Sequence, residues 1–365
     1  MITSMHIKNF KCFKDFDIEL GPFNVLIGPN DSGKTSLLQA IELLSEMGMK
    51  PRLRPVEEVR QRVGFPLGQE AVWRTDPAGW SAIGAVARDA QSGDTRALSA
   101  RSGRPKGSGW IGYWAQEEPI TEGKLTLSPD TDEQPIGKSS NSLRQWFPGK
   151  IGKALYVRFT PEGLRAPAPL STEKLKLGAD GTGLPRYLHE IWGGQRDAFL
   201  ALESEFYQRF PEYKRLVIEP QQPANRGEAG LGLSFETTHK EVLSAKSVSD
   251  GAILGLAYLT LCYDPSPPAI LLIEEPETGI HHARLKEIVQ TLKGVAGDKG
   301  VQVILTTHSP YLLDEVEMDQ VHVFQKDDEG AVHARKLSEF KGASEISDMF
   351  ATGEKWSLLS EQCGI

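Results

Sequence analysis

The eight-residue segment Gly28–Thr35 constrains the fold more than any other part of this sequence. It reads GPNDSGKT and matches the pattern G-x4-G-K-[ST]. Glycines in such a loop let backbone N–H groups converge on phosphate oxygens, while the lysine reaches the terminal phosphates and the hydroxyl ligates Mg2+. The pattern carries this meaning where it follows a strand and opens a helix, and Phe23–Ile27 and Thr35–Glu46 have the apolar spacing of those elements. We therefore predict an α/β fold with a triphosphate site.

Each polar residue of this segment has an expected role. Lys34 offers its ammonium to the terminal phosphates, and Thr35 offers its hydroxyl to Mg2+. The helix that begins here adds the positive end of its dipole to the same anion. The candidate nucleotide-binding residues of the segment are Gly28, Asn30, Ser32, Gly33, Lys34, Thr35 and Ser36.

A second apolar run, residues 270–273, ends in the two carboxylates Glu274 and Glu275. Because side chains alternate along a strand, we expect the two carboxylates to point to opposite sides and to have different roles. Glu274 is the candidate metal residue and holds Mg2+ through a water. Glu275 is the candidate catalytic base that polarises an attacking water. A solvated strand end is the alternative interpretation, and the phosphate loop upstream makes it less favoured.

Two more candidate residues lie at the ends of predicted elements. Ser249, Asp250 and Gly251 precede a predicted helix, and a serine cap with a glycine at a helix start forms a second anion site. A capped helix without a ligand would have the same residues. His308 follows the apolar strand 301–306, and in a parallel sheet it would lie beside the phosphate site. A structural histidine at a strand end is the alternative.

The order of these segments resembles the ABC-type ATPases, and the RecF/SMC/OLD-like branch in particular. The opening stretch IKNFKCFKDFDIELGPFNVLIGPNDSGKTSLLQAI resembles that branch almost end to end, as do EEPETGIHHARL and the later TTHSP. The resemblance is specific over residues 1–46 and 243–325 and weak between them. It implies an ATPase head with a mixed or parallel core sheet flanked by helices, an antiparallel β subdomain and a mixed insertion.

The resemblance also implies roles that the residues alone do not. Ser249 and Gly251 match the family's signature motif, which contacts the γ-phosphate of ATP bound by the other protomer. His308 matches the switch histidine that senses this phosphate, and Lys11 stands where the branch often keeps a basic residue near the nucleotide. The implied ligands are ATP and Mg2+, and the implied partner is a second copy of the chain in an ATP-dependent homodimer.

Three features depart from the family pattern. Glu274 stands where an aspartate is usual, and its longer side chain should still act through water. Asp250 replaces the first glycine of the signature. The Q-loop glutamine has two candidates, Gln69 and Gln116, that nothing in the sequence separates. We therefore expect ATP hydrolysis to be slow or stimulated by a partner.

The pattern of apolar and turn-forming residues in the middle of the chain differs from that at its ends. Over residues 51–130, short apolar stretches alternate with Gly, Pro, Ser and Asp clusters, which predicts an antiparallel β subdomain. Residues 131–242 form a predicted mixed insertion, so the ATPase core consists of 1–50 together with 243–365. No heptad pattern is sustained, which excludes a long coiled coil. We expect any nuclease or effector to be a separate protein.

Charge and apolar content limit the partners. The net charge of −8 argues against nucleic-acid binding over the whole surface but permits a local basic patch. The candidate DNA-binding stretches are Lys50–Arg62 and Arg96–Lys106. The three cysteines lack metal-ligand spacing, and the apolar runs are far shorter than the ~20 residues that span a bilayer. We therefore predict a cytoplasmic protein without a membrane partner.

Three functions remain open at this point. The favoured one is an ATPase whose closure gates a DNA-related or antiphage-defence activity of a partner, and this biological role rests on resemblance alone. The second is a regulatory scaffold that binds ATP with little turnover. The third, the nucleotide-binding subunit of a transporter, is disfavoured by the Ser-Asp-Gly signature and by the large insertion.

Overall fold

The computed structural model describes residues 1–49, 54–60, 63, 80–89, 92–103, 112–121, 124, 125, 127, 146, 151, 152, 154–170, 177–221, 230–340 and 351–363. The chain divides into two compact units. The first unit comprises Met1–Tyr156, Pro268–Glu274 and Gly300–Ile365, and the second comprises Val157–Pro267 and Glu275–Lys299. No helix in these described ranges is both long enough and apolar enough to cross a membrane.

The first sheet of the first unit is antiparallel and has the strand order β2-β1-β5-β6-β7-β4. The third, fourth and fifth strands in this order, β5, β6 and β7, extend the β2–β1 hairpin with which the chain begins. The antiparallel strands predicted within residues 51–130 therefore share a sheet with the first two strands. The strands are β1 (Ile2–Phe10), β2 (Phe13–Glu19), β4 (Arg54–Pro55), β5 (Ser81–Arg88), β6 (Thr95–Gly103) and β7 (Gly112–Glu118), with the separate pair β8 (Ile120–Thr121) and β9 (Lys124–Leu125).

The second sheet of the first unit has the order β10-β15-β16-β3-β17-β18. Strands β15, β16, β3 and β17 run parallel, and β18 pairs antiparallel with β17. Every residue of β3, β15 and β16 is buried, which agrees with the non-alternating apolar pattern of a sheet covered on both faces. The bounds are β3 (Phe23–Ile27), β10 (Ala154–Val157), β15 (Ile270–Glu274), β16 (Gln302–Thr306), β17 (Val321–Lys326) and β18 (Val332–Lys336).

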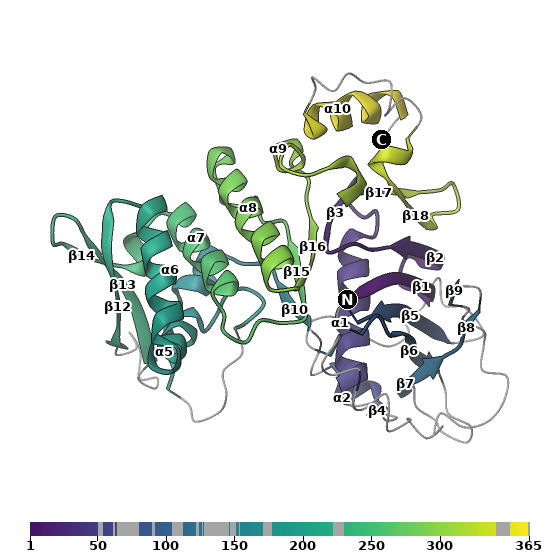
Figure 1. The fold of residues 1–365 in the computed structure, drawn as a ribbon, viewed down its shortest axis with the longest axis horizontal. Coiled ribbons are helices and arrows are strands. Elements are labelled where there is room, and N and C mark those ends of the chain that lie inside the picture. Colours follow the sequence, from purple (N-terminus) through teal and green to yellow (C-terminus); the bar gives the residue numbers. More distant parts are fainter. Residues whose placement is uncertain are drawn as a thin grey trace. The chain divides into compact units, whose positions relative to one another are not determined.

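Helix α1 (Lys34–Met49) packs into one apolar core with both of these sheets (Figure 1). That core joins α1 leucines such as Leu38 to Leu98 of the first sheet and to Leu272 of the second. The predicted helix over Thr35–Glu46 is confirmed and is slightly longer. The other helices of this unit are α2 (Val56–Arg60), α9 (Pro310–Leu313), α10 (Thr352–Cys363) and the 3-10 turns η4 (Met318–Gln320) and η5 (Leu337–Glu339); the sequence analysis did not predict α10.

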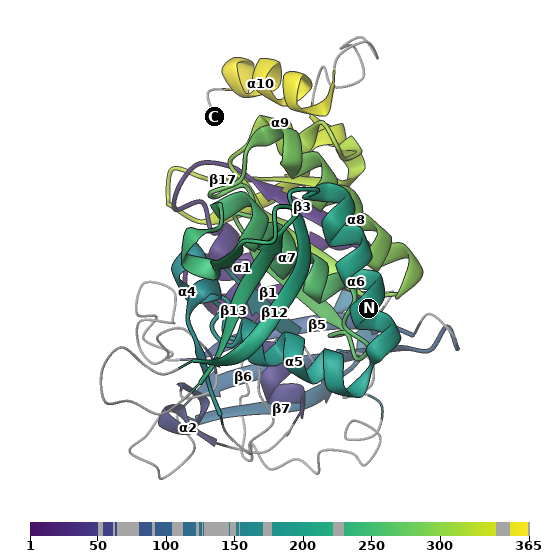
Figure 2. The same cartoon turned by 90° about the vertical axis from the view of Figure 1, so that its left-hand side faces the viewer.

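The second unit combines a small antiparallel sheet with helices. Figure 2 shows its two long strands, β12 and β13, running side by side along the unit. Helix α7 is apolar and buried along its length from Ala252 onward, so it forms the core of this unit. The elements are α4 (Pro161–Arg165), β11 (Ala168–Pro169), α5 (Leu184–Gly194), α6 (Arg196–Arg209), β12 (Tyr213–Gln221), β13 (Gly230–Thr237), β14 (Val242–Ser244), η3 (Ala245–Ser247), α7 (Asp250–Cys262) and α8 (His282–Asp298).

Candidate functional site

The predicted phosphate loop lies between β3 and α1, and its glycines have structural reasons. Gly28 has φ 152°, and a Cβ there would lie 2.3 Å from the Phe324 carbonyl oxygen of β17. Gly33 has φ 99°, and a Cβ there would lie 3.0 Å from Cys12 Sγ. Both positions therefore exclude side chains, and the backbone of the loop is held close to its neighbours.

Lys34 is buried, with 6% of its surface exposed, and its ammonium folds back onto the loop. Its Nζ donates to the carbonyl oxygens of Gly28 at 2.7 Å and Pro29 at 2.8 Å. These contacts hold the Lys34 ammonium against the backbone of the loop. This arrangement fits the terminal phosphates of a nucleotide.

Glu274 ends β15 with 5% of its surface exposed, and two hydroxyl groups donate to its carboxylate. One is Thr35 Oγ1 from the start of α1, and the other is the phenol of Tyr156 on the adjacent strand β10. A carboxylate beside a threonine hydroxyl offers the hard oxygen ligands that Mg2+ prefers, so these residues fit the implied ion. Sequence reasoning missed Tyr156, because no motif marks it.

Strands β15, β16 and β3 lie side by side in the second sheet (Figure 1), and their pairing brings the phosphate loop, Glu274 and the segment of His308 to one edge. Glu274 is level with Thr306 of β16, and Thr306 is level with Leu26 of β3, two residues before Gly28. His308 follows two residues after Thr306 and is exposed. Because parallel strands end at the same edge, the sequence order of these motifs becomes a spatial cluster in the first unit.

The turn that carries Lys11 lies against the phosphate loop. Cys12 contacts Ser36 of α1 through a side-chain hydrogen bond, and Lys11 Nζ donates to Gln39 of the same helix. Burial lowers the pKa of Lys11 to about 8, and burial raises the pKa of the Cys12 thiol. Lys11 also has φ 51°, a left-handed conformation that is unfavourable for a side chain with a Cβ. Its sequence-based assignment to the nucleotide site remains a prediction.

Glu275 belongs to the second unit and does not continue the strand. Its φ of 48° turns the backbone away from β15, so the two glutamates differ through this turn and not through strand alternation as the sequence analysis assumed. Its carboxylate lies 3.2 Å from the guanidinium of Arg158, which follows β10. Arg158 is a second residue that the sequence analysis missed.

Ser249 and Gly251 form the start of α7 in the second unit. Ser249 is the N-cap and its hydroxyl accepts from the Ala252 N–H at 3.3 Å, which confirms the predicted cap. Ser249 is exposed, and a Cβ on Gly251 would meet no atom within 4 Å. Neither close packing nor a left-handed backbone requires a glycine at position 251. The open space beside Gly251, at the start of α7, can therefore receive an external group.

Among the described residues of the second basic stretch, Arg101 does not belong to a surface patch. Arg101 is buried, and its guanidinium lies 2.6 Å from the equally buried Glu118. Adjacent antiparallel strands β6 and β7 bring the two together, which a stretch read in isolation cannot reveal. Arg96 lies 3.0 Å from Asp94. Arg104 and Lys106 lie outside the described residues, as do Lys50, Arg52 and Arg62 of the first stretch.

Neither candidate for the Q-loop glutamine is placed by the structure. Gln69 lies outside the described residues. Gln116 contributes its backbone to β7, where it is level with Ser99 of β6. Cys12 and Cys262 are free thiols, in agreement with the absence of disulfide spacing.

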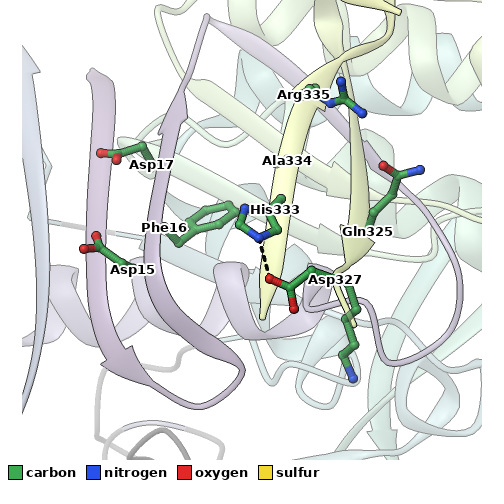
Figure 3. A pocket seen from close by; sticks show the side chains of 9 residues that line it. Asp15, Phe16, Asp17, Gln325, Asp327, His333, Ala334 and Arg335 are labelled. Atoms are coloured by element: carbon green, nitrogen blue, oxygen red, sulfur yellow. Dashed lines mark hydrogen bonds and ion pairs between the residues drawn. The ribbon is translucent and has the colours of Figure 1, made fainter. Parts of the chain in front are cut away.

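A separate pocket of about 530 Å3 lies in the first unit between β2 and the β17–β18 hairpin (Figure 3). Its charged lining residues are Asp15, Asp17, Lys326, Asp327 and Arg335, and His333 lies 3.0 Å from Asp327. Beside it, His6 lies opposite Asp17 across the β1–β2 pair, at 2.7 Å. Both histidine contacts join neighbouring strands, and the pocket-lining Lys326 lies 2.6 Å from Asp31 of the phosphate loop.

Comparisons with known proteins agree with this architecture. Residues 1–65 match a family described as "AAA ATPase domain", and residues 174–314 match one described as "AAA domain, putative AbiEii toxin, Type IV TA system". A stretch of 44 residues is 46% identical to the OLD nuclease of Thermus scotoductus and 54% to the DNA replication and repair protein RecF of Vibrio vulnificus. These matches cover 12% of this chain and 8% and 12% of the two relatives.

The fold is similar to that of SMC heads. The crystal structure of an SMC head bound to the C-terminal winged-helix domain of ScpA covers 94% of this chain and 99% of its own, with a TM-score of 0.58 and 15% identity. An SMC head with an extended coiled coil, bound to the C-terminal domain of ScpA derived from Pyrococcus furiosus, has a TM-score of 0.52 and 13% identity over 99% of this chain and 98% of its own.

The parallel sheet, the glycine loop and the carboxylate at the strand end define a P-loop ATPase head. The matched families and relatives narrow this class further. The matched segments and the fold are similar to those of ABC-type ATPases of the RecF/SMC/OLD-like branch.

Proposed function

We propose that this chain binds Mg·ATP at the sheet edge of its first unit and hydrolyses it in a symmetric pair. The observation that carries the proposal is the convergence of the Lys34 ammonium, the Thr35–Glu274 contact and the His308 segment on one edge. Lys34 would hold the terminal phosphates, and Thr35 and Glu274 would hold Mg2+ directly or through water. Bound Mg2+ supplies positive charge that offsets the charge of the phosphates.

In this proposal Glu275 accepts a proton from the water whose oxygen attacks the γ-phosphorus, and ADP leaves. His308 contacts the γ-phosphate and reports its presence. Ser249 and Gly251 of one copy contact the ATP held by the other copy, which gives the open space at the start of α7 an occupant. The site is then complete only in the pair, so ATP concentration controls association.

A scaffold with little turnover is the second candidate, and one contact favours it. The guanidinium of Arg158 lies 3.2 Å from the Glu275 carboxylate, so the proposed base already has an ion-pair partner. Either function is compatible with a cytoplasmic protein that gates a DNA-related or antiphage-defence activity of a separate partner. Residues Lys50–Arg62 remain the proposed DNA contact.

Two measurements test the proposal. Steady-state phosphate release with Mg·ATP should be measurable and should be abolished in Glu275→Gln. Light scattering should detect an ATP-dependent dimer of Glu275→Gln at saturating Mg·ATP. A monomer under that condition would refute the shared site, whereas a dimer with no turnover in the unmodified protein would favour the scaffold.

A further inference from the structure

Arg165 makes several contacts with the turn that carries Ser249, to which Tyr213 also hydrogen-bonds. Arg165, at the end of α4, donates from Nε to the Ala245 carbonyl oxygen at 2.9 Å and from Nη2 to the Val248 carbonyl oxygen at 2.6 Å. The same Nη2 lies 2.6 Å from the Asp250 carboxylate. One guanidinium therefore binds the chain on both sides of Ser249.

The contacts of Arg165 differ from those of a typical surface arginine in their burial and in their backbone partners. Its side chain is 17% exposed, so the contacts are largely shielded from water. The guanidinium has a rigid fork of donors, and two of its partners are backbone carbonyls that cannot move without moving the turn. The backbone ahead of the helix is thereby fixed in position.

The residues held by Arg165 are themselves exposed. Ser249 and Asp250 reach solvent, and Gly251 has open space before it. A buried anchor beneath an exposed polar turn is the arrangement expected of a preformed binding surface, because a fixed turn loses little conformational freedom when a ligand arrives.

We propose that Arg165 is a positioning residue that presets the Ser249–Gly251 turn for the phosphate of ATP held by a second copy of the chain. This inference rests on the proposed function, and it adds a residue that no motif marks. Arg165 itself makes no contact with the nucleotide. Its loss would leave nucleotide binding by the separate chain intact and weaken the pairing of two chains.

The symmetry of the pair sets the size of the effect. Each dimer contains two such turns. If each substituted turn lowers the association constant about fivefold and the two act independently, the association constant falls about 25-fold. We therefore expect the ATP-dependent dimer dissociation constant to rise at least tenfold in Arg165→Gln.

The experiment uses the full chain in the Glu275→Gln background, which stops turnover. Dimer dissociation constants come from sedimentation velocity at saturating Mg·ATP, and nucleotide affinity comes from a fluorescent ATP analogue at protein concentrations where the chain is monomeric. Arg186→Gln is the matched control, because Arg186 is a similarly buried arginine of the same unit that pairs with Glu190. The exposed Asp250→Ala removes one contact of Arg165 and serves if Arg165→Gln fails to fold.

The expected result is weaker dimerisation of Arg165→Gln, and to a smaller extent of Asp250→Ala, with unchanged binding of the analogue and an unaffected control. Equal dimerisation of Arg165→Gln and its parent would overturn the inference while the proposed function stands. A Glu275→Gln parent that stays monomeric with ATP would overturn both.

Discussion

The pH dependence of nucleotide binding tests the assignment of Lys11. Burial lowers the pKa of this lysine to about 8, although Cys12 and Glu42 oppose the shift. An ammonium attracts the phosphates of a nucleotide, and a neutral amine does not. We expect the affinity for ATP to fall as the pH rises through 8, because binding selects the protonated form.

The size of this effect follows from the pKa. With a pKa of about 8, the charged fraction falls from about 0.9 at pH 7 to about 0.1 at pH 9, so the dissociation constant should rise by at most about tenfold. Lys11 is partly exposed, and solvent screening makes tenfold an upper limit. The raised pKa of Cys12 keeps its thiol neutral over most of this range.

The free energy of unfolding should change with pH in the direction opposite to the affinity for ATP. Between pH 8 and the ordinary value of 10.5, the unfolded chain binds a proton at Lys11 that the folded chain does not. In the absence of nucleotide, Lys11 therefore increases the free energy of unfolding as the pH rises from 8 to 10.5. A mutation of Lys11 should remove both effects together.

The assay is a titration with a fluorescent ATP analogue at saturating Mg2+, from about pH 7 to about pH 9, beyond the titration of unperturbed histidines. Lys11→Met should bind more weakly at pH 7 with a flat profile, and Lys11→Arg should keep its charge and also be flat. Parallel profiles for the unmodified protein and Lys11→Met would refute the assignment of Lys11 to the nucleotide site.

Three further substitutions probe contacts that join distant parts of the chain. Tyr156→Phe removes a donor to Glu274, so the Mg2+ concentration for half-maximal turnover should rise at least several-fold with little change in kcat, as a Mg2+ titration would measure. Arg158→Gln releases Glu275 and should raise basal phosphate release a few-fold; reduced release would instead indicate that the arginine assists the reaction. Glu118→Gln removes the carboxylate charge beside the buried guanidinium of Arg101 and should lower the free energy of unfolding by about 3–5 kcal/mol in urea titrations, whereas an unchanged midpoint would contradict a buried ion pair.

Local patterns predicted the central elements because each of these elements has a characteristic spacing of apolar residues within a short segment. The apolar run Phe23–Ile27 and the helix after the glycine loop were both correct, since buried parallel strands and helices have distinct periods. The mixed or parallel character of the core sheet followed from the resemblance, and the sequence did not predict the order of its strands. The extent of the first antiparallel sheet, in which β5 pairs with β1, depends on long-range pairing that no local window contains.

The residues that sequence reasoning missed share one property, which is a partner far away in the chain. Tyr156 contacts a carboxylate 118 positions later, and Arg165 contacts one 85 positions later. The burial of Arg101 was missed for a related reason, because its partner Glu118 lies on the adjacent strand. A motif identifies residues that touch the ligand, but the side chains that hold them in place are identified only when the chain is folded.

Backbone strain gives an independent view of where the site lies. Among the described residues, five that are not glycine have positive φ, and three of them are Lys11, Asp31 in the phosphate loop and Glu275. Each such residue costs on the order of 1–2 kcal/mol relative to a relaxed conformation, so the rest of the fold must hold it there. Lys11 and Asp31 both lie in the first unit, on the turn after β1 and in the phosphate loop, where strain is expected if the backbone must aim polar groups at a bound anion. Glu275, in the second unit, has the same left-handed conformation at the position proposed for the catalytic base.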